Sequence, residues 1–258
     1  MKARIRRFFE RARQTYAQAA TVQTLAAAQC AAVLPPGRYG RVLEIGAGAG
    51  LLARELAKRL DWDLYLALDL APGMLDFPWE EAKPISKVAA DGEALPLRPA
   101  SVDLVVSSSA LQWYETPETS IPAALALLKP GGRFALSVFT RGTLAELAEV
   151  SRITGFGSVH PLRPAAFYTA LLQSLPGITV QARPLLWTTR HLNVSDFLHS
   201  LRRTGTQHSP EKRPFSRRRY QEFCRVYAER FSEAGTERPV LATYCAVLVW
   251  GGREKANG

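Results

Sequence analysis

The first half of the chain alternates short apolar runs with amphipathic segments. The runs have the length of buried strands, and the segments between them carry apolar residues at helical spacing. The predicted strands lie in RVLEI, LYLALD, SKVAAD, VDLVVSSS and RFALSVF. Strands that alternate with helices predict an α/β domain with a doubly wound, mostly parallel sheet.

The segment before the first strand, residues 1–34, is predicted to be helical. Phe9, Tyr16 and Gln23 follow one another at intervals of seven residues and therefore share one face of the predicted helix. The sequence PPGRYG then ends the helix, because proline and glycine cannot continue it.

The second half of the chain is less regular. It predicts helices in GTLAELAEV and PAAFYTALLQSL, a strand in ITVQARPLLWTTR, two further helices, and a last strand in PVLATYCAVLVW. No internal repeat interrupts this order. We therefore expect one domain of residues 1–258, in which residues 190–237 form a helical insertion between the last two of seven strands.

The composition restricts the class of protein. The chain has 258 residues, 47% hydrophobic and 22% charged, which is typical of one sizeable soluble domain. No apolar run is long enough to cross a membrane, and the basic N-terminal segment has no apolar stretch of the kind found in secretory signals. The three cysteines and four histidines show no disulfide framework and no metal-ligand spacing. We expect a cytoplasmic protein without a metal.

The charge balance is strongly basic. Lys and Arg number 33 against 23 Asp and Glu, a net charge of +10, and the basic residues concentrate in residues 2–13 and 202–225. Such an excess attracts polyanions such as nucleic acid, an anionic membrane or an acidic protein. The alternative is that both tracts are solvated helix faces.

A glycine-rich loop follows the first predicted strand. Gly46, Gly48 and Gly50 lie between that strand and a helix, where glycine permits a sharp turn and close approach to a ligand. Asp69 ends the second strand, where a carboxylate can accept both hydroxyls of a ribose, and Asp91 ends the third. The pattern predicts a nucleoside-containing cofactor.

Two kinds of cofactor fit a glycine loop of this type. The sequence GAGLLA fits the permissive dinucleotide motif. This match begins at the second glycine of the loop and runs into the helix, so it leaves Glu44 and Gly46 unexplained. A dinucleotide also places its pyrophosphate on the helix N-terminus. S-adenosylmethionine has no phosphate and needs a ribose acid, an adenine acid and a loop that tolerates an amino-acid group. The pattern favours S-adenosylmethionine.

Five sequence blocks carry a resemblance to a known family. VLEIGAGAG, ALDLAPGML, ADGEALPL, VDLVVSSSALQW and LLKPGGRFALSVF follow the order and spacing of the class I S-adenosylmethionine-dependent methyltransferases, which the chain resembles over residues 41–139. The resemblance implies a cofactor core of residues 38–140 in which Glu44 orients the cofactor's amino group, Asp69 holds the ribose, and Asp91 with Gly92 holds the adenine. The implied cofactor residues are Glu44, Gly46, Ala47, Gly48, Gly50, Asp69, Leu70, Met74, Asp91, Gly92, Glu93 and Ser107. Each acid could instead be a helix cap.

Further blocks narrow the resemblance. FFERARQTYAQAATVQ, SSSALQW, RGTLAELAEV and FLHSLRRTGTQ are similar to the malonyl-acyl-carrier-protein O-methyltransferases of biotin synthesis. The chain departs from that family in having GAGAG where GCGTG is common, and in a more basic segment after RTGTQ. The resemblance implies methylation of a malonyl carboxylate to its methyl ester, with S-adenosylhomocysteine as the second product and an acidic acyl carrier protein as the partner.

The residues after the fourth strand suit a carboxylate substrate. Such a carboxylate is ionised at neutral pH and needs no general base. Gln112 and Trp113 are uncharged donors that can hold it without lowering its nucleophilicity. We expect catalytic residues at Tyr16, Gln112, Trp113 and Arg203, and substrate contacts from these four and Gln23. The N-terminal helix would then cap the substrate. Packing of Trp113 and Tyr16, and a surface position for Arg203, are the alternatives.

Two other functions stay open. One is methylation of another small molecule on a carboxyl group or carbon, such as an aconitate-like acid or a quinone precursor. The other is a non-catalytic nucleic-acid-binding protein on the same fold, since the basic tract contains Phe215, Tyr220 and Phe223, which could stack bases. The same aromatic residues suit a helix core, so nucleic acid and membrane are the less favoured partners.

Overall fold

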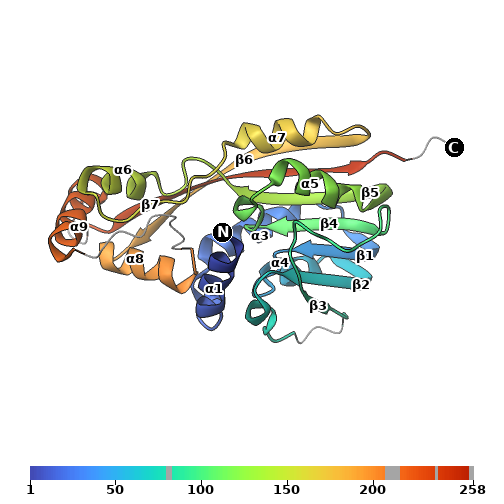
Figure 1. The fold of residues 1–258 in the computed structure, drawn as a ribbon, viewed down its shortest axis with the longest axis horizontal. Helices are drawn as coiled ribbons and strands as arrows, with labels where there is room; N and C mark the ends of the chain where they lie inside the picture. Colours follow the sequence, from blue (N-terminus) through green and yellow to red (C-terminus); the bar gives the residue numbers. More distant parts are fainter. Residues whose placement is uncertain (80–82, 207–215, 236–237, 256–258) are drawn as a thin grey trace.

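The computed structural model describes residues 1–79, 83–206, 216–235 and 238–255. Its strands form one seven-stranded sheet in the order β3-β2-β1-β4-β5-β7-β6 (Figure 1). β7 pairs antiparallel with β5 and β6, and the other neighbours pair parallel. The strands are β1 Gly37–Ile45, β2 Leu60–Asp69, β3 Ser86–Ala89, β4 Val102–Ser108, β5 Leu128–Phe139, β6 Ile178–His191 and β7 Val240–Arg253. The predicted doubly wound, mostly parallel sheet of seven strands is confirmed, and its last strand is antiparallel.

Alternating side chains of the central strands build one hydrophobic core on each face of the sheet. Val42 and Leu104 pack on one face with helices α3 (Thr21–Ala32) and α4 (Leu51–Ala57). Leu43 and Val105 pack on the other face with α5 (Pro117–Ala126) and α7 (Ala165–Gln173). Both faces are therefore buried, as a parallel sheet requires. The carboxyl ends of the strands are left to form sites.

The N-terminal segment is not one helix as predicted. It forms α1 (Lys2–Ala12), the short α2 (Tyr16–Ala19) and α3, with Ala20 outside helical geometry at φ −82° and ψ 49°. The Thr15 hydroxyl bonds the Ala12 carbonyl and, at 2.8 Å, the Arg203 carbonyl. Side-chain bonds of this kind compete with helical ones. The break lets α3 cover the sheet while α1 crosses its edge (Figure 1).

The predicted insertion between the last two strands holds α8 (Val194–Arg203) and α9 (Arg217–Phe231). Together with α6 (Ala145–Thr154) they surround the outer ends of β6 and β7, away from the other strands (Figure 1). A third core of Val150, Phe197, Phe223 and Tyr227 holds these helices together. Phe223 therefore belongs to a helix core, the alternative to base stacking, whereas Phe215 lies outside the described residues.

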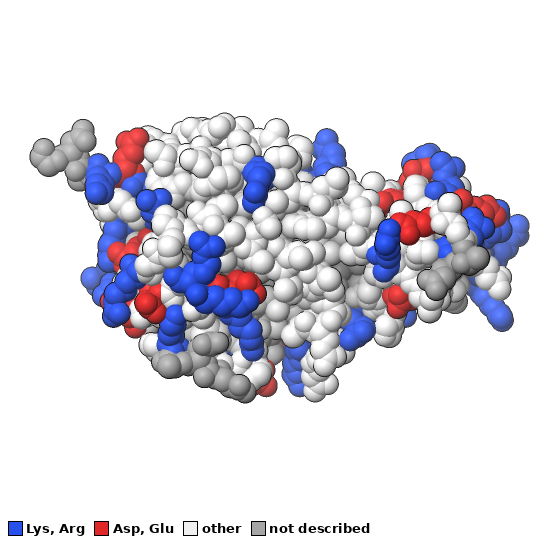
Figure 2. All heavy atoms as spheres, turned by 180° about the vertical axis from the view of Figure 1, so that it is seen from behind, with Lys and Arg blue, Asp and Glu red and all other residues white. Residues whose placement is uncertain are grey.

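Charged side chains are unevenly distributed over the surface. Seen from behind, they gather at the two ends of the molecule, and the middle of that face carries few (Figure 2). Within the described part of the chain, no helix has both the length and the apolar composition to span a membrane. The same part contains no group of three or more potential metal ligands.

Candidate active site

The glycine loop is held to the end of β2. Gly46, Gly48 and Gly50 all have positive φ, at 72°, 53° and 72°. A Cβ at Gly46 would collide with Ala110, and one at Gly50 with the Phe77 ring. The Gly48 N–H donates to the Asp69 carboxylate at 2.8 Å. The loop and the predicted ribose acid therefore form one rigid unit.

A first cavity of about 90 Å³ lies at this edge of the sheet. Most of the predicted cofactor residues line it, namely Gly46, Gly48, Asp69, Leu70, Met74, Asp91, Gly92 and Glu93. They come from the ends of β1, β2 and β3, which parallel pairing brings to one edge. Brought together in this way, they form a candidate cofactor site.

The other four predicted cofactor residues do not line the first cavity but lie behind the residues that do. Glu44 is buried and accepts a hydrogen bond of 2.6 Å from the Tyr65 hydroxyl. The Ser107 hydroxyl donates to the Ile45 carbonyl at 2.7 Å. Ala47 is buried in the core, and Gly50 gives room to the Phe77 ring. In the structure these residues support the loop from behind, and their contact with a cofactor stays a prediction.

Helix α1 closes the outer side of the first cavity, which the sequence analysis missed. Its lining residues are Lys2, Ile5, Arg6 and Phe9. The Lys2 ammonium lies 2.6 Å from the Asp91 carboxylate and 2.8 Å from that of Glu93. The spacing of positions 2, 5, 6 and 9 is that of one helix face, so the pattern was present in the sequence.

Burial and hydrogen bonding set the charges around this cavity. Burial raises the pKa of Glu44 to about 8, although the hydrogen bond from Tyr65 lowers it. The Glu44 carboxyl is therefore protonated at neutral pH. Burial also raises the pKa of Asp69, opposed by the N–H groups of Ala71 and Gly48. Burial alone would raise the pKa of Glu93, but Lys2 and the Thr116 N–H lower it to about 2.

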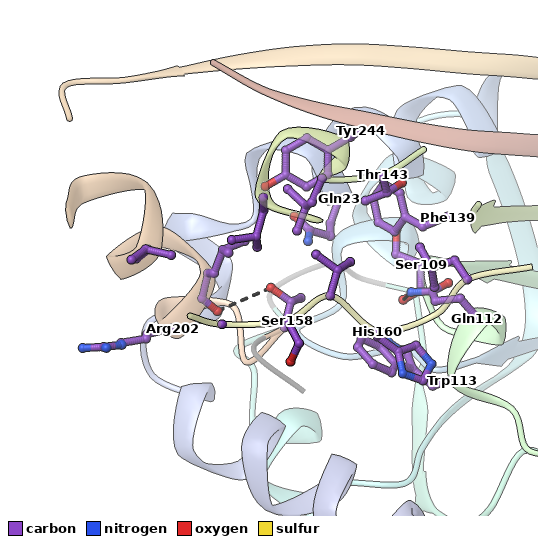
Figure 3. Close-up of a pocket in the computed structure, with 18 of the residues that line it drawn as sticks. Gln23, Ser109, Gln112, Trp113, Phe139, Thr143, Ser158, His160, Arg202 and Tyr244 are labelled. Atoms are coloured by element: carbon purple, nitrogen blue, oxygen red, sulfur yellow. Dashed lines mark hydrogen bonds between the residues drawn. The ribbon is translucent and has the colours of Figure 1, made fainter. Parts of the chain in front are cut away.

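A second cavity of about 350 Å³ lies between the sheet edge and the insertion (Figure 3). Tyr16, Gln23, Gln112 and Trp113 line it, so the structure brings together four of the five predicted substrate residues. Most of the other lining residues come from α6 and the loops on either side of it, α8, α9 and β7. It is lined mainly by apolar side chains with a few polar groups, as small-molecule sites are.

The two cavities share a wall. Phe9, Tyr16, Ser109 and Trp113 line both of them. The Phe9 ring lies 6.2 Å from that of Tyr16 and 5.9 Å from that of Trp113, both edge to face. Burial raises the pKa of Tyr16, with a contribution from the Asp69 charge, so its hydroxyl keeps its proton. A ligand in either cavity would therefore lie next to these rings.

Ser109 and Gln112 present polar atoms at this wall. Ser109 has a positive φ of 60°, which is strained for a residue other than glycine. The Gln112 amide donates to the Ser109 carbonyl at 2.7 Å. The Ser109 hydroxyl and the Gln112 Oε1 are buried and have no hydrogen-bond partner among the described residues. Such orphaned atoms point to a ligand, and the sequence analysis missed Ser109 among three consecutive serines.

His160 is a second residue that the sequence analysis missed. Its ring lies 5.0 Å from that of Trp113, at 30° to it, and both line the second cavity. Burial lowers the pKa of His160, although a hydrogen bond with the Gln112 backbone opposes this, so the ring is neutral at neutral pH. His160 lies in the loop after α6, outside any motif.

Arg203 does not line either cavity. Its guanidinium lies 3.5 Å from the Gln18 Oε1, which fits the surface alternative. Arg202 and Arg219 line the second cavity instead, and the Arg202 guanidinium turns outward (Figure 3). Lys212 and Arg213, also in the basic tract, lie outside the described residues.

The comparisons agree with this fold. Residues 43–136 match a family model described as a methyltransferase domain. The crystal structure of a protein from Bacillus halodurans C-125, described as a putative methyltransferase, superposes with a TM-score of 0.62 at 15% identity, covering 89% of this chain and 99% of that one. Both matches show that the protein has the class I methyltransferase fold.

The sequence relatives identify the family within that class. A malonyl-[acyl-carrier protein] O-methyltransferase from Methylococcus capsulatus is 33% identical over 81% of this chain and 74% of its own length. The biotin biosynthesis bifunctional protein BioHC from Cellvibrio japonicus is 32% identical over 91% of this chain, which spans 47% of that longer protein. The chain belongs to the malonyl-[acyl-carrier protein] O-methyltransferase family.

The first cavity fits the cofactor of this class. Asp69 and Asp91 line it and would supply the carboxylates for a ribose and an adenine, and at Gly92 any side chain would collide with Tyr114 and Ile45. The aromatic rings of the shared wall attract a cation such as a sulfonium. When bound there, S-adenosylmethionine would supply a methyl group on a positively charged sulfur.

Proposed function

We propose that the protein transfers a methyl group from S-adenosylmethionine to the free carboxylate of malonyl-acyl-carrier protein. The product is the methyl ester, formed early in biotin synthesis, with the cytoplasm as the expected location. The observation that carries the proposal is the wall shared by the two cavities, because uncharged donors line it and a cofactor and an acceptor would lie on its two sides.

The residues of the shared wall suit a carboxylate nucleophile. A malonyl carboxylate is ionised at neutral pH, so the site needs donors rather than a general base. The Ser109 hydroxyl, the second N–H of the Gln112 amide and the Trp113 indole N–H can supply them without adding a positive charge. The neutral His160 adds no cation next to Trp113. The carboxylate oxygen keeps its negative charge for attack.

The chemistry requires alignment above all. A carboxylate oxygen forms a bond to the methyl carbon as the bond from that carbon to sulfur breaks, and two opposite charges disappear. Tyr16 and Phe9 hold the boundary between the cavities, so they fix the distance and direction of the attack. Gln23, buried in the same cavity, closes it from α3.

The basic surface fits an acidic carrier protein. Arg202, Arg217, Arg218 and Arg219 have no ion pair with any described residue, and three of them begin α9. Arg202 and Arg219 lie at the second cavity, so this surface adjoins the acceptor site. Unpaired cations steer an anionic partner and speed its encounter. In this proposal residues 190–237 act as a lid over the crevice, and residues 1–34 cap cofactor and substrate.

Transfer of label from S-adenosylmethionine tests the function. The purified protein is incubated with malonyl-carrier protein, carrier protein without the malonyl group, or free malonic acid. We expect label on the malonyl-carrier protein only. Methylation of the free acid at an equal rate would assign the protein to small-molecule carboxyl methylation instead. Binding to nucleic acid at physiological salt without any methyl transfer would favour the non-catalytic alternative.

A further inference from the structure

Two buried polar side chains of the second cavity lie apart from the shared wall. Gln23 of α3 and Tyr244 of β7 line the second cavity and not the first. Gln23 is 7% exposed and Tyr244 is 9% exposed. Neither the Gln23 amide nor the Tyr244 hydroxyl has a hydrogen-bond partner among the described residues. Buried polar groups without a partner are costly and rare, so this pair points to a ligand.

The two side chains belong to the same part of the cavity wall. The third core holds Tyr244 together with Val22, the neighbour of Gln23, and α3 contacts β7. In the view of Figure 3, Gln23 lies between Tyr244 and Ser109. Phe139, which ends β5, lines the cavity next to Tyr244, with 6.0 Å between the ring centroids. A ligand held at Ser109 can therefore extend toward this pair.

Both side chains can donate a hydrogen bond without carrying a charge. Burial raises the pKa of the Tyr244 hydroxyl, and the charge of Glu146 adds to this, so the hydroxyl keeps its proton. The Gln23 amide has two N–H groups. Glu146 accepts a hydrogen bond of 3.1 Å from the Thr243 N–H, which fixes its carboxylate beside β7. That negative charge repels a second anion, so the pair suits a neutral acceptor such as a carbonyl oxygen.

We infer that Tyr244 and Gln23 bind the thioester carbonyl of the malonyl group. The inference rests on the proposed function, which places the malonyl carboxylate at Ser109 and Gln112. One methylene separates that carboxylate from the thioester carbonyl, so both ends of the acyl group are held at once. Two fixed ends leave the carboxylate oxygen fewer orientations than one, which favours attack on the methyl group. The rest of the cavity is left for the carrier's arm.

A substrate that lacks only the carbonyl tests this contact. Addition of acrylate to the carrier's thiol gives a 2-carboxyethyl thioether, which keeps the carboxylate, the sulfur and the arm but has a methylene in place of the carbonyl. Methyl transfer to this carrier and to malonyl-carrier protein is measured in single turnovers with excess enzyme, so that slow transfer is still detected. The two carboxylates differ in their own reactivity. The ratio of the malonyl rate to the thioether rate is therefore compared between protein variants.

Two cavity variants and one control are compared with the wild type. Tyr244→Phe removes one hydroxyl and keeps the buried ring, and Gln23→Met removes the amide and keeps the length of the side chain. Tyr168→Phe removes the hydroxyl of a buried tyrosine of α7 that lines neither cavity, and it is the matched control. The ratio should fall about tenfold in each cavity variant, or by about 1.4 kcal/mol, and keep its wild-type value in Tyr168→Phe.

The outcomes separate this inference from the proposed function. An unchanged ratio in either cavity variant, with equal losses on both substrates or with none, would overturn the inference. That side chain would then contact the arm or serve packing alone. If the wild type still methylates malonyl-carrier protein, the proposed function stays intact. Transfer to neither carrier would refute both.

Discussion

The Lys2 ammonium lies 2.6 Å from the Asp91 carboxylate, so the first helix of the chain is fixed to the end of β3. The Met1 amino group lies 3.0 Å from Glu115, and the Gly73 N–H donates to Glu10 at 2.9 Å. These contacts hold α1 across the first cavity. α1 therefore forms the outer side of the candidate cofactor site.

Removal of the Lys2 charge should loosen this closure. Lys2→Met breaks both contacts to the carboxylates, and partly exposed ion pairs are worth about 0.2–1 kcal/mol each. We expect S-adenosylmethionine to dissociate a few times faster, as measured by stopped-flow fluorescence. Arg7→Met, on the exposed side of the same helix, is the control and should match the wild type. Identical dissociation rates in all three proteins would show that α1 does not retain the cofactor.

Glu44 should make stability depend on pH. Its pKa is about 8 in the folded protein against an ordinary value of 4.5, so the folded state binds a proton that the unfolded state has lost between these values. The free energy of unfolding should therefore fall as pH rises from about 5 to about 8. Glu44→Gln, which is neutral and of the same shape, should flatten this part of the curve in urea titrations. A variant that keeps the wild-type slope would mean that Glu44 is ionised in the folded protein.

Tyr16 and Gln112 should affect turnover more than cofactor binding. If they align the carboxylate, Tyr16→Phe and Gln112→Leu should lower kcat by about tenfold or more and change the calorimetric Kd for S-adenosylmethionine only slightly. Tyr39→Phe removes a hydroxyl that donates to the Pro35 carbonyl, outside both cavities, and serves as the control. Wild-type turnover in both variants would make Tyr16 and Gln112 packing residues.

The basic surface should make activity sensitive to salt. Exposed charges are screened beyond about 8 Å at physiological ionic strength. Raising salt should therefore lower kcat/KM steeply for malonyl-carrier protein and much less for malonyl-coenzyme A, which is smaller. Arg217→Glu with Arg218→Glu should reproduce the loss at low salt, whereas Arg38→Glu, at the exposed start of β1, should not. Parallel salt curves for the two substrates would exclude carrier docking on this surface.

The sequence predicted the elements whose signal is local. The apolar runs before Gly46, Asp69 and Ser107 are strands because both faces of the sheet are buried, and this pattern needs no knowledge of tertiary contacts. The single N-terminal helix was wrong because its break depends on a bond from Thr15 to Arg203, which lies far away in the sequence. The predicted spacing nevertheless brings Phe9, Tyr16 and Gln23 to one cavity.

The candidate site was predictable only where motifs mark it. Gln112 and Trp113 follow a strand end, and that position places them at the edge where parallel strands meet. His160 comes from a loop without a motif and reaches Trp113 only through the packing of that loop. Arg202 lines the cavity and Arg203 does not, because successive side chains of an α-helix point in directions about 100° apart.

The position of the transferred methyl group tests the central claim most directly. Malonyl-carrier protein is incubated with the enzyme and methyl-labelled S-adenosylmethionine, the acyl group is released, and its fragments are analysed by mass spectrometry. We predict one labelled methyl on the distal carboxyl oxygen, and mild alkali should remove it as methanol and restore the free acid. Label on the central carbon of the malonyl group or on a nitrogen of the carrier would contradict a carboxyl O-methyltransferase. The absence of any transferred label would contradict it as well.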